Sequence, residues 1–424
     1  MSKFGSIVLM AMLLSVHVVQ SQNTFSPYTV FGLGEIHTPS MSNNFAMGEV
    51  GIGTPSVWHL NNMNPALLTS NTFSVFEIAL QGENRNISND LGSQQAGTAG
   101  YKYISFAFPI IPGRWTSNFG ITPFSSINYR FNTTIPVEND PSVNTFVDFQ
   151  GDGGLTEINW SNGIRLAPGL SVGIRSSFVF GFSQNETTSF LTGNDITNFL
   201  PSTVNEKTNY KGLTYGFGLA YGTKLGSGKN SIGFGIIYDI AKDLPGSRVV
   251  QFQSSTVNGG TIAGDTLAHR TLDDYYSLPA KFGFGVSWIK DNFLTVGIDF
   301  TLSDWKPDAG FGSDGERYQQ TMSAGIGLEI IPNFDDVDSY LARIRYRVGF
   351  KYTQMPYVIN GNSIDDFGIS FGWSLPVRSV SSLNMAFKIG QRGKVSDNLI
   401  KENYLKFVLG ATINDRWFVR RKYN

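Results

Sequence analysis

The chain of 424 residues contains no cysteine and only four histidines, which are His17, His37, His59 and His269. Without cysteine it has no disulfide, no zinc–thiolate site, no iron–sulfur cluster, no cysteine nucleophile and no lipidated N-terminal cysteine. The histidines follow no paired spacing, so they supply too few ligands for a metal site and no partner for a serine nucleophile. We therefore expect no cofactor, no metal and no enzymatic activity.

Charge and long apolar runs are also scarce. Asp, Glu, Lys and Arg make up 15% of the residues, well below the roughly 25% of an average soluble protein. The formal net charge is −1, and no basic stripe of the kind that binds nucleic acid is present. Beyond the N-terminus no apolar run approaches the roughly 18 residues of a spanning helix. If this chain enters a membrane, it must cross as strands.

The first residues, MSKFGSIVLMAMLLSVHVVQSQ, have the layout of an export signal. Lys3 supplies the positive region, Ile7–Val19 the apolar run, and Val19-Gln20-Ser21 the small groups at the usual cleavage positions. A short membrane anchor is the alternative, but the apolar run falls short of the roughly 20 residues that a spanning helix needs. We predict a signal peptide over residues 1–21 that is removed on export.

What the chain has in abundance is alternation with a period of two. In LARIRYRVGFKY, residues 341–352, arginine stands at positions 343, 345 and 347, and aliphatic or aromatic residues fill the positions between them. Only an extended strand sends alternate side chains to opposite faces. The pattern returns in 212–221, 292–304 and 321–330, where an apolar row alternates with a row of small or polar residues. Such strands suit a wall that is apolar on one face and mildly polar on the other.

The links between these segments are alternately short, such as 290–291, and longer and polar, such as 184–207 and 244–277. Outer-membrane barrels have short periplasmic turns and long outer loops, and a sheet in hydrocarbon must close because every backbone group needs a partner. A soluble β-sandwich is the alternative, but the second row is too small and polar for a packed core. We predict an all-β protein, a 14-stranded antiparallel transmembrane β-barrel over 72–418 with a periplasmic tail at 419–424, in a Gram-negative outer membrane. The predicted strands are 72–81, 101–110, 115–131, 154–166, 169–183, 208–222, 230–243, 278–289, 292–304, 318–331, 339–354, 364–375, 382–393 and 403–415.

The charged row of the barrel is expected to face the lumen, because an arginine on the lipid face near the midplane costs about 2–4 kcal/mol. This register places five charged side chains on three consecutive strands: Asp299, Glu329, Arg343, Arg345 and Arg347. In one interpretation they brace the wall and bind the backbone of an interior plug. In the other, the surplus of cations over carboxylates binds the head group of an amphipathic acid.

Residues 22–71 show little alternation and are dense in Gly, Ser, Asn and Pro. A disordered leader is one interpretation. The segment nevertheless carries Phe31, Leu33, Phe45 and Trp58, and this apolar content exceeds that of a solvated tail. A compact plug inside the barrel accounts both for the apolar residues and for the glycines, which permit close backbone approach.

Three short motifs in this segment resemble the N-terminal hatch of the FadL family, the outer-membrane long-chain fatty acid and hydrocarbon transporters. They are Gly32-Leu33-Gly34, Ala46-Met47-Gly48 and the element Asn64, Pro65, Ala66 and Leu67. The resemblance implies a fourteen-stranded barrel and a hatch over residues 22–71. It extends to Leu278-Pro279, Asp304-Trp305 and the closing Asn414-Asp415-Arg416-Trp417-Phe418. The chain ends in Asn, and in this it resembles members of the family from Bacteroidota.

In that family the ligand leaves sideways through an opening at a kink in the third strand. The third strand predicted here carries Pro123 in its interior and Gly120 three residues earlier. Proline cannot donate to a ladder, so a proline within a strand marks an edge, a bulge or a break. We predict unpaired backbone over 120–125 and a lateral gate at Gly120 and Pro123. A simple bulge without a transport role is the alternative.

These features favour a passive outer-membrane transporter for hydrophobic or amphipathic, fatty-acid-like molecules, with membrane lipid and a small hydrophobic ligand as its partners. The alternative is a FadL-like barrel that does not transport and serves as a scaffold or carrier subunit of an outer-membrane secretion or assembly complex. Its docking surfaces would be the loop 244–277 and the basic tail at 420–422. A hydrolase is disfavoured because His269, the only histidine of the barrel region, falls in a predicted loop.

Overall fold

The computed structural model describes residues 25–90, 92–138, 140–193, 201–226, 228–255, 261–305, 317–359, 361–378, 381–396 and 399–415. The predicted signal peptide at 1–21 and the predicted tail at 419–424 lie outside the described residues.

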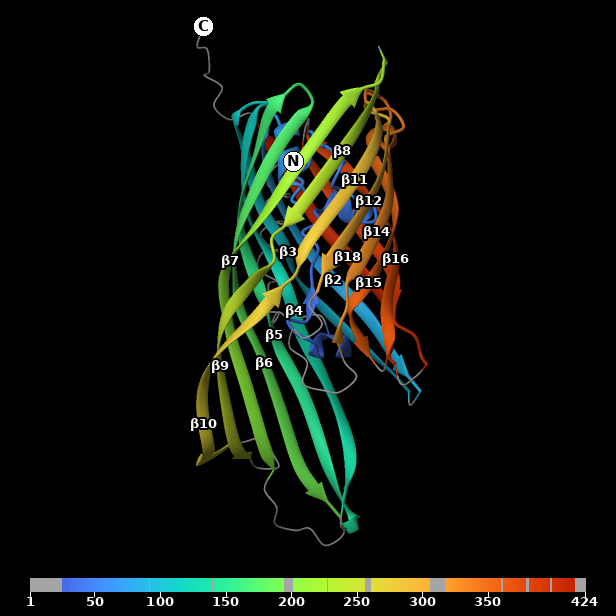
Figure 1. Cartoon of the computed structure of the whole chain (residues 1–424). Coiled ribbons are helices and arrows are strands. Elements are labelled where there is room, and N and C mark those ends of the chain that lie inside the picture. The colour runs from blue at the N-terminus through green and yellow to red at the C-terminus, as the bar shows by residue number, and fades with distance from the viewer. Residues whose placement is uncertain are drawn as a thin grey trace, which may run out of the picture.

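The described strands form one antiparallel sheet that closes on itself, since the last strand pairs with the first long one (Figure 1). Two wall strands are interrupted: β8 and β9 both pair with β7, and β10 and β11 are separated by Pro279, which has no N–H to donate. Counting each interrupted pair once, the described chain has fourteen wall strands, so the predicted barrel is confirmed. The strands are β2 (Ser74–Asn89), β3 (Gly92–Ile111), β4 (Trp115–Val137), β5 (Asp140–Ala167), β6 (Leu170–Thr192), β7 (Ser202–Lys224), β8 (Asn230–Asp239), β9 (Lys242–Ser255), β10 (Thr261–Leu278), β11 (Ala280–Lys290), β12 (Leu294–Asp304), β14 (Thr321–Ile330), β15 (Arg345–Ile359), β16 (Asn362–Arg378), β17 (Ser381–Arg392) and β18 (Lys401–Asp415).

The remaining described elements are short. They are η1 (Pro27–Val30), β1 (Glu35–Ile36), α2 (Ser42–Ala46), η2 (Pro65–Ser70), β13 (Arg317–Tyr318) and η3 (Leu341–Arg343). Within the described ranges, no helix has the length and apolar character to span a membrane.

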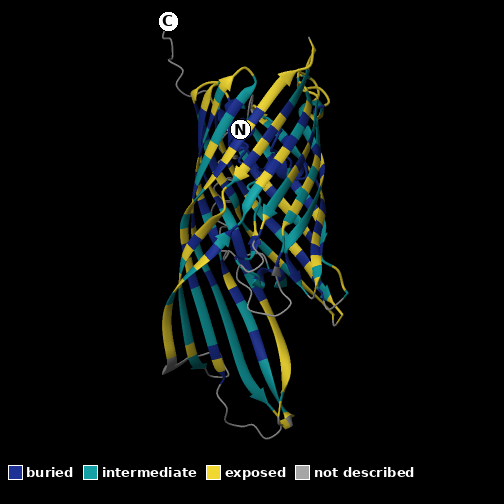
Figure 2. Cartoon of the chain, viewed as in Figure 1, coloured by how far each residue is buried: buried dark blue, intermediate teal, exposed yellow. Residues whose placement is uncertain are grey.

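The outer surface of the barrel carries the apolar rows that the alternation predicts. Along β7 the side chains of Leu213, Tyr215, Phe217, Leu219 and Tyr221 are exposed, and small residues alternate with them on the inner face. Figure 2 shows the same exchange of exposed and buried positions across the barrel wall. A face this apolar requires a hydrocarbon environment.

The predicted long loops are wrong over most of their length. The segments 82–100, 132–153, 184–207 and 244–277 mostly continue the neighbouring strands into long hairpins. Outside lipid both faces of a hairpin contact water, so the hydrophobic alternation fades while the backbone ladder persists. The extension is one-sided, because β5 has 28 residues and β12 has 11, and β4–β7, β9 and β10 reach past the other strands in Figure 1.

Candidate functional site

The N-terminal segment, residues 25–71, contacts lumen-facing positions on strands all around the barrel. Wall glycines make the approach possible: a Cβ at Gly235 would collide with the carbonyl oxygen of Ile52, and one at Gly349 would collide with the backbone of Gly48. At Gly173 the obstacle is the backbone of Pro65. The small inner row of the strands therefore accommodates the backbone of this segment.

The Asn64–Leu67 element begins η2 and fastens the segment to the wall. Asn64 Oδ1 accepts from the backbone N–H of Ala66 at 3.0 Å, which caps the helix. Asn64 Nδ2 donates to the carbonyl oxygens of Ile52 at 2.8 Å and Leu219 at 3.1 Å. Pro65 presets the first helical residue, and Leu67 is buried with Ala220 of β7. The element thus links two parts of the segment to β7.

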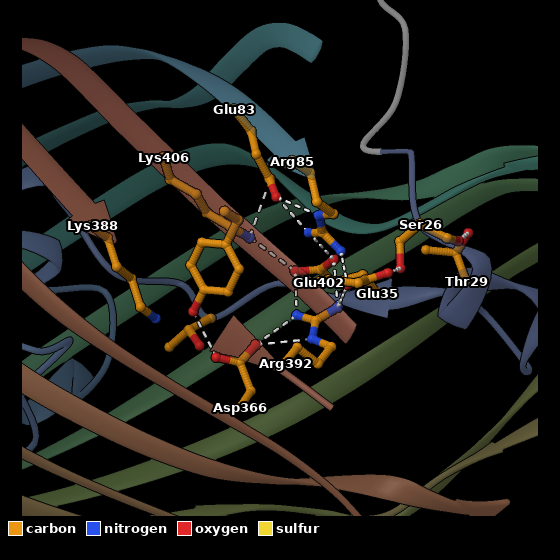
Figure 3. A network of polar contacts seen from close by, with 12 residues as sticks. Ser26, Thr29, Glu35, Glu83, Arg85, Asp366, Lys388, Arg392, Glu402 and Lys406 are labelled. Carbon is orange, nitrogen blue, oxygen red and sulfur yellow. Dashed lines mark hydrogen bonds and ion pairs between the residues drawn. The ribbon is translucent and has the colours of Figure 1, made fainter. Parts of the chain in front are cut away.

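Glu35 of β1 lies in a buried cluster of charges contributed by β2, β16, β17 and β18 (Figure 3). Its carboxylate lies 3.0 Å from nitrogen atoms of Arg85, Arg392 and Lys406. Arg85 also binds Glu402, and Arg392 binds Asp366 at 2.9 Å. Burial alone would raise the pKa of Glu35, but the charges of Arg392, Lys406 and Arg85 outweigh it and hold that pKa well below its usual range. Glu35 is therefore an anion fixed among three cations.

Glu49 makes a second charged attachment. It forms ion pairs with Lys351 of β15 and, at 3.1 Å, with Lys388 of β17. Burial alone would raise the pKa of Glu49, but Lys351 and Lys388 lower it well below its usual range. Apart from histidines, Glu35 and Glu49 are the only charged residues in 22–71. Both carboxylates of the segment thus neutralise cations of the wall.

The predicted charge row is only partly assembled. Glu329 pairs with Arg347 at 2.6 Å and with Arg345 at 3.5 Å. Asp299 Oδ2 instead accepts from the backbone N–H groups of Gly51 at 2.6 Å and Ile52 at 2.7 Å. Glu329 is thus shared by two arginines, and Asp299 binds the backbone of the N-terminal segment rather than a cation of this row.

Arg343 does not belong to this row. The strand begins at Arg345, and Arg343 ends the 3-10 helix η3, where its guanidinium lies 5.6 Å from the ring centre of Tyr340. The backbone N–H of Arg343 donates to the carbonyl oxygen of Tyr340, which closes a turn in place of a ladder. Placing Arg343 on a lumen-facing strand position was therefore wrong, because alternation alone does not show where a turn ends.

The barrel ladder is incomplete between β3 and β4. Their pairing runs from Ile111–Trp115 to Ile104–Ile121 and stops there. Beyond that point the described part of β3 pairs only with β2, whereas the free edge of β4 is met by the N-terminal segment, with Ile36 opposite Ser125. The predicted interval 120–125 thus includes the end of the pairing and a bulge between Pro123 and Ser125 in the pairing with β5.

A cavity of about 350 Å³ lies between the N-terminal segment and the wall. Its lining includes Thr122, Pro123 and Phe124, which are the β4 residues just beyond the last β3–β4 pair. Apolar groups such as Ile237, Leu278 and Trp305 share the lining with ionised side chains. A cavity of this mixed character suits an amphipathic molecule better than a purely apolar one.

Sequence reasoning missed most of the Glu35 cluster. Arg85 was placed in a predicted loop, and Glu35 and Glu402 were not singled out. One signal was available: two lone carboxylates in an otherwise uncharged, apolar segment must be paired if that segment is buried.

The closed barrel and its apolar exterior define the class of protein, a transmembrane β-barrel of the outer-membrane type. The chain belongs to the BamG family, whose model matches residues 1–424. No curated protein matches the chain in sequence.

Solved structures share the fold at low sequence identity. The toluene transporter TodX of P. putida is 14% identical, with a TM-score of 0.56 over 88% of this chain and 98% of that one. A FadL homologue of Pseudomonas aeruginosa is 13% identical, with a TM-score of 0.58 over 89% of this chain and 99% of that one. These similarities define the barrel as FadL-like in fold.

Proposed function

We propose that the protein is a passive outer-membrane channel for hydrophobic or amphipathic small molecules and has no catalytic activity. Residues 22–71 act as the plug, or hatch, of this channel. The lateral exit is the interrupted β3–β4 ladder, which ends at Ile121, so that Gly120 is still paired with Ser105 and Pro123 lies in the unpaired part. The similar barrels of TodX and the FadL homologue support this proposal, since TodX is described as a toluene transporter.

One observation carries the proposal: the cavity reaches β4 at the residues that have lost β3 as a partner. A fully paired β3–β4 ladder would separate the cavity from lipid. Where the ladder stops, the edge of β4 needs another partner, because backbone groups exposed to hydrocarbon cost several kcal/mol each. Here the N-terminal segment covers part of the β4 edge, since the N–H of His37 donates to the carbonyl oxygen of Phe124. Backbone groups on this edge of β4 are thus hydrogen-bonded by a segment that is not part of the wall.

Attachment of a bulky thiol reagent tests the route. The natural chain has no cysteine, so a maleimide reacts only at an introduced one. Pro123→Cys places the label at the cavity, and Thr134→Cys places it on the same β4 edge, at an exposed residue that is not part of the cavity lining. We expect the label to abolish most uptake of radiolabelled oleate in the first variant and little in the second, in a Gram-negative host without its own fatty-acid channel. Equal uptake by the two labelled variants would contradict the proposed exit.

The one-sided wall favours a second function, that of a carrier or scaffold subunit in an outer-membrane complex. The hairpins of β4–β7, β9 and β10 extend past the barrel on one flank only and present a large surface away from the cavity. The described part of the predicted docking loop 244–277 belongs to these hairpins, and the predicted docking tail lies outside the described residues. Cross-linking in whole cells, followed by purification in mild detergent, separates the two functions. A stoichiometric partner together with unchanged oleate uptake in a deletion strain would favour the scaffold.

A further inference from the structure

One border of the hairpins that extend past the barrel is an exposed strand edge. Past Ile121 the described part of β4 has no wall strand on the side that faces β3, and in the wall it pairs with β5 alone. Every residue from 130 to 136 is exposed, whereas the residues opposite them on β5, 144–150, are buried or half-buried. Such an edge presents a row of backbone N–H and C=O groups to its surroundings.

The N-terminal segment shows which backbone groups point out of this edge. The N–H of Ser26 donates to the carbonyl oxygen of Asn128 at 2.9 Å. Successive residues of a strand direct their backbone groups to opposite edges, so those of Arg130, Asn132 and Thr134 point out of the same edge as those of Asn128. Among the described residues no strand pairs with these three residues on this side.

The side chains of the same stretch form one apolar and one polar row. Ile127 faces the N-terminal segment, because a Cβ at Gly34 would collide with its side chain. Phe131 and Ile135 follow on that face, and the ring of Phe131 stacks on Phe149 of β5 with 5.1 Å between the ring centres. The alternate positions are polar. A strand added at this edge therefore needs apolar side chains on the first face and polar ones on the second.

Sheet edges are usually protected against strand addition by charge, proline or irregular register. The opposite border strand, β10, has such protection, since it carries Asp273 and Asp274 and its pairing with β9 shifts register twice. Over residues 129–135 of β4 the only charged side chain is Arg130, which is paired with Asp148 at 3.0 Å. The register with β5 is regular over this stretch. Up to Pro136 the β4 edge thus lacks the usual protection.

The N-terminal segment already adds a strand to this edge. β1 pairs with it antiparallel, with Glu35 opposite Ser126 and Ile36 opposite Ser125. Beyond Asn128 no described part of the segment pairs with the edge. An extended peptide is the ligand whose donors and acceptors repeat at the spacing of a strand edge, so a second strand can continue where β1 stops.

We propose that the β4 edge over residues 130–135 binds an extended segment of another protein at the cell surface. This segment adds to the sheet as a β-strand and packs apolar side chains on Phe131 and Ile135. The edge lies on the long hairpins, away from the short turns, which places the partner outside the cell (Figure 1). The inference rests on the carrier or scaffold function and adds its surface and the chemistry of its partner. It does not involve the cavity.

Photochemical cross-linking in living cells of the bacterium that makes the protein tests the edge. p-Benzoylphenylalanine replaces Phe131 at the edge or, as the control, Phe252 of β9 in the interior of the same sheet, and the two side chains are 39% and 42% exposed. Asn132→Pro removes an edge N–H that β5 does not use, and Asn132→Ala keeps it. We expect a discrete adduct at Phe131 that Asn132→Ala retains and Asn132→Pro lowers about tenfold, the effect of one unpaired buried group.

Three further results belong to the expected outcome. The probe at Phe252 gives far less adduct than the probe at Phe131. The cross-linked peptide, identified by mass spectrometry, comes from another protein and alternates apolar and polar residues. Thr134→Pro, at the next outward-pointing position, lowers the adduct as Asn132→Pro does. Semi-native electrophoresis, in which a folded barrel migrates differently from the heated chain, verifies that each variant is folded.

Several outcomes overturn the inference. No adduct at Phe131, or equal adducts in Asn132→Pro and Asn132→Ala, means that the backbone edge binds no strand. Equal adducts at Phe131 and Phe252 assign binding to the apolar face as a whole. A cross-linked peptide from this chain makes the occupant a second copy. A stoichiometric partner that co-purifies equally with wild type and Asn132→Pro overturns strand addition alone, whereas the absence of any partner overturns the scaffold function as well.

Discussion

Two flanks of the barrel differ in whether their charged side chains are paired and in whether their backbone ladder is complete. On the flank of β2 and β15–β18, wall cations are paired with carboxylates, including Glu35 and Glu49 of the N-terminal segment, and the strands form an unbroken ladder. On the β3–β4 flank the ladder stops at Ile104 and Lys102 has no carboxylate. The first flank holds the segment in place, and the second leaves groups available to a ligand. The charge pairs that stabilise the segment and the groups available to a ligand thus lie on different flanks of the same barrel.

The largest expected effect is on the paired flank. Glu35→Gln leaves Arg85, Arg392 and Lys406 without their shared carboxylate, and breaking a buried ion pair costs about 3–5 kcal/mol. The check is the urea midpoint followed by tryptophan fluorescence in detergent micelles. Asp148→Asn is the control, because its partner Arg130 is 65% exposed, and exposed pairs contribute about 0–1 kcal/mol. Equal midpoints for the two variants would remove the distinction between the flanks.

Acid should weaken the attachment of the segment in two stages. Burial lowers the pKa of His37 to about 4, from about 6.5 in an unfolded chain. As the pH falls, the imidazole therefore takes up its proton at a higher pH in the unfolded state than in the folded state. The contribution of His37 to the free energy of unfolding is fully present above pH 6.5 and is lost as the pH falls toward 4. The depressed pKa values of Glu35 and Glu49 add a further loss only below the usual carboxylate range near 4.5. The groups that act on His37 are Glu35, Lys406, Lys102 and Glu83.

Unfolding midpoints from pH 8 to 3.5 check this sequence of events. His37→Gln should flatten the decline between pH 6.5 and 4 and leave the loss at lower pH. An unchanged slope in the variant would show that His37 is not buried as a neutral group.

A smaller effect is expected at the Asn64–Leu67 element. Asn64→Ala removes the helix cap and leaves the carbonyl oxygens of Ile52 and Leu219 with one donor fewer each, at about 1–3 kcal/mol. Limited proteolysis within residues 25–71 measures release of the segment. Asn132→Ala, at an exposed position of β4, is the control, and equal cleavage of the two variants would contradict the anchoring role.

The smallest effect should come from the unpaired lysine. Lys102→Met removes a cation that has no carboxylate, so we expect a change in the free energy of unfolding within about 1 kcal/mol, of either sign. Lys406→Met removes partners from Glu35 and Glu83 and should lower the urea midpoint clearly. A destabilisation by Lys102→Met as large as that by Lys406→Met would mean that the two flanks do not differ.

The barrel was predictable because lipid enforces alternation: along β7 and β12 every second residue must be apolar, and the pattern can be read directly. The ends of the strands were not predictable, since hairpins in water keep the ladder without the apolar row, as in 132–153. The carboxylate partners were also hidden. Glu35 and Arg85 are 50 positions apart, and Glu35 and Arg392 are 357 apart, so only the folded segment brings them together. Pro123 lies two residues beyond the last β3–β4 pair, and it could be singled out from the sequence because a missing N–H is a property of the residue itself.

The interrupted ladder has a mechanical consequence. Past Ile104 the backbone ladder of the described part of β3 is formed with β2 alone, so the outer part of the β2–β3 hairpin has ladder support only on the side of β18. We expect this part of the hairpin to bend without loss of a β3–β4 ladder bond, although the hydrogen bond between Tyr101 and Thr156 of β5 would break, and the width of the opening beside β4 would then change. The backbone amides of β3 past Ile104 that point away from β2 should accordingly exchange deuterium much faster than those of β17, which pairs with a strand on both sides.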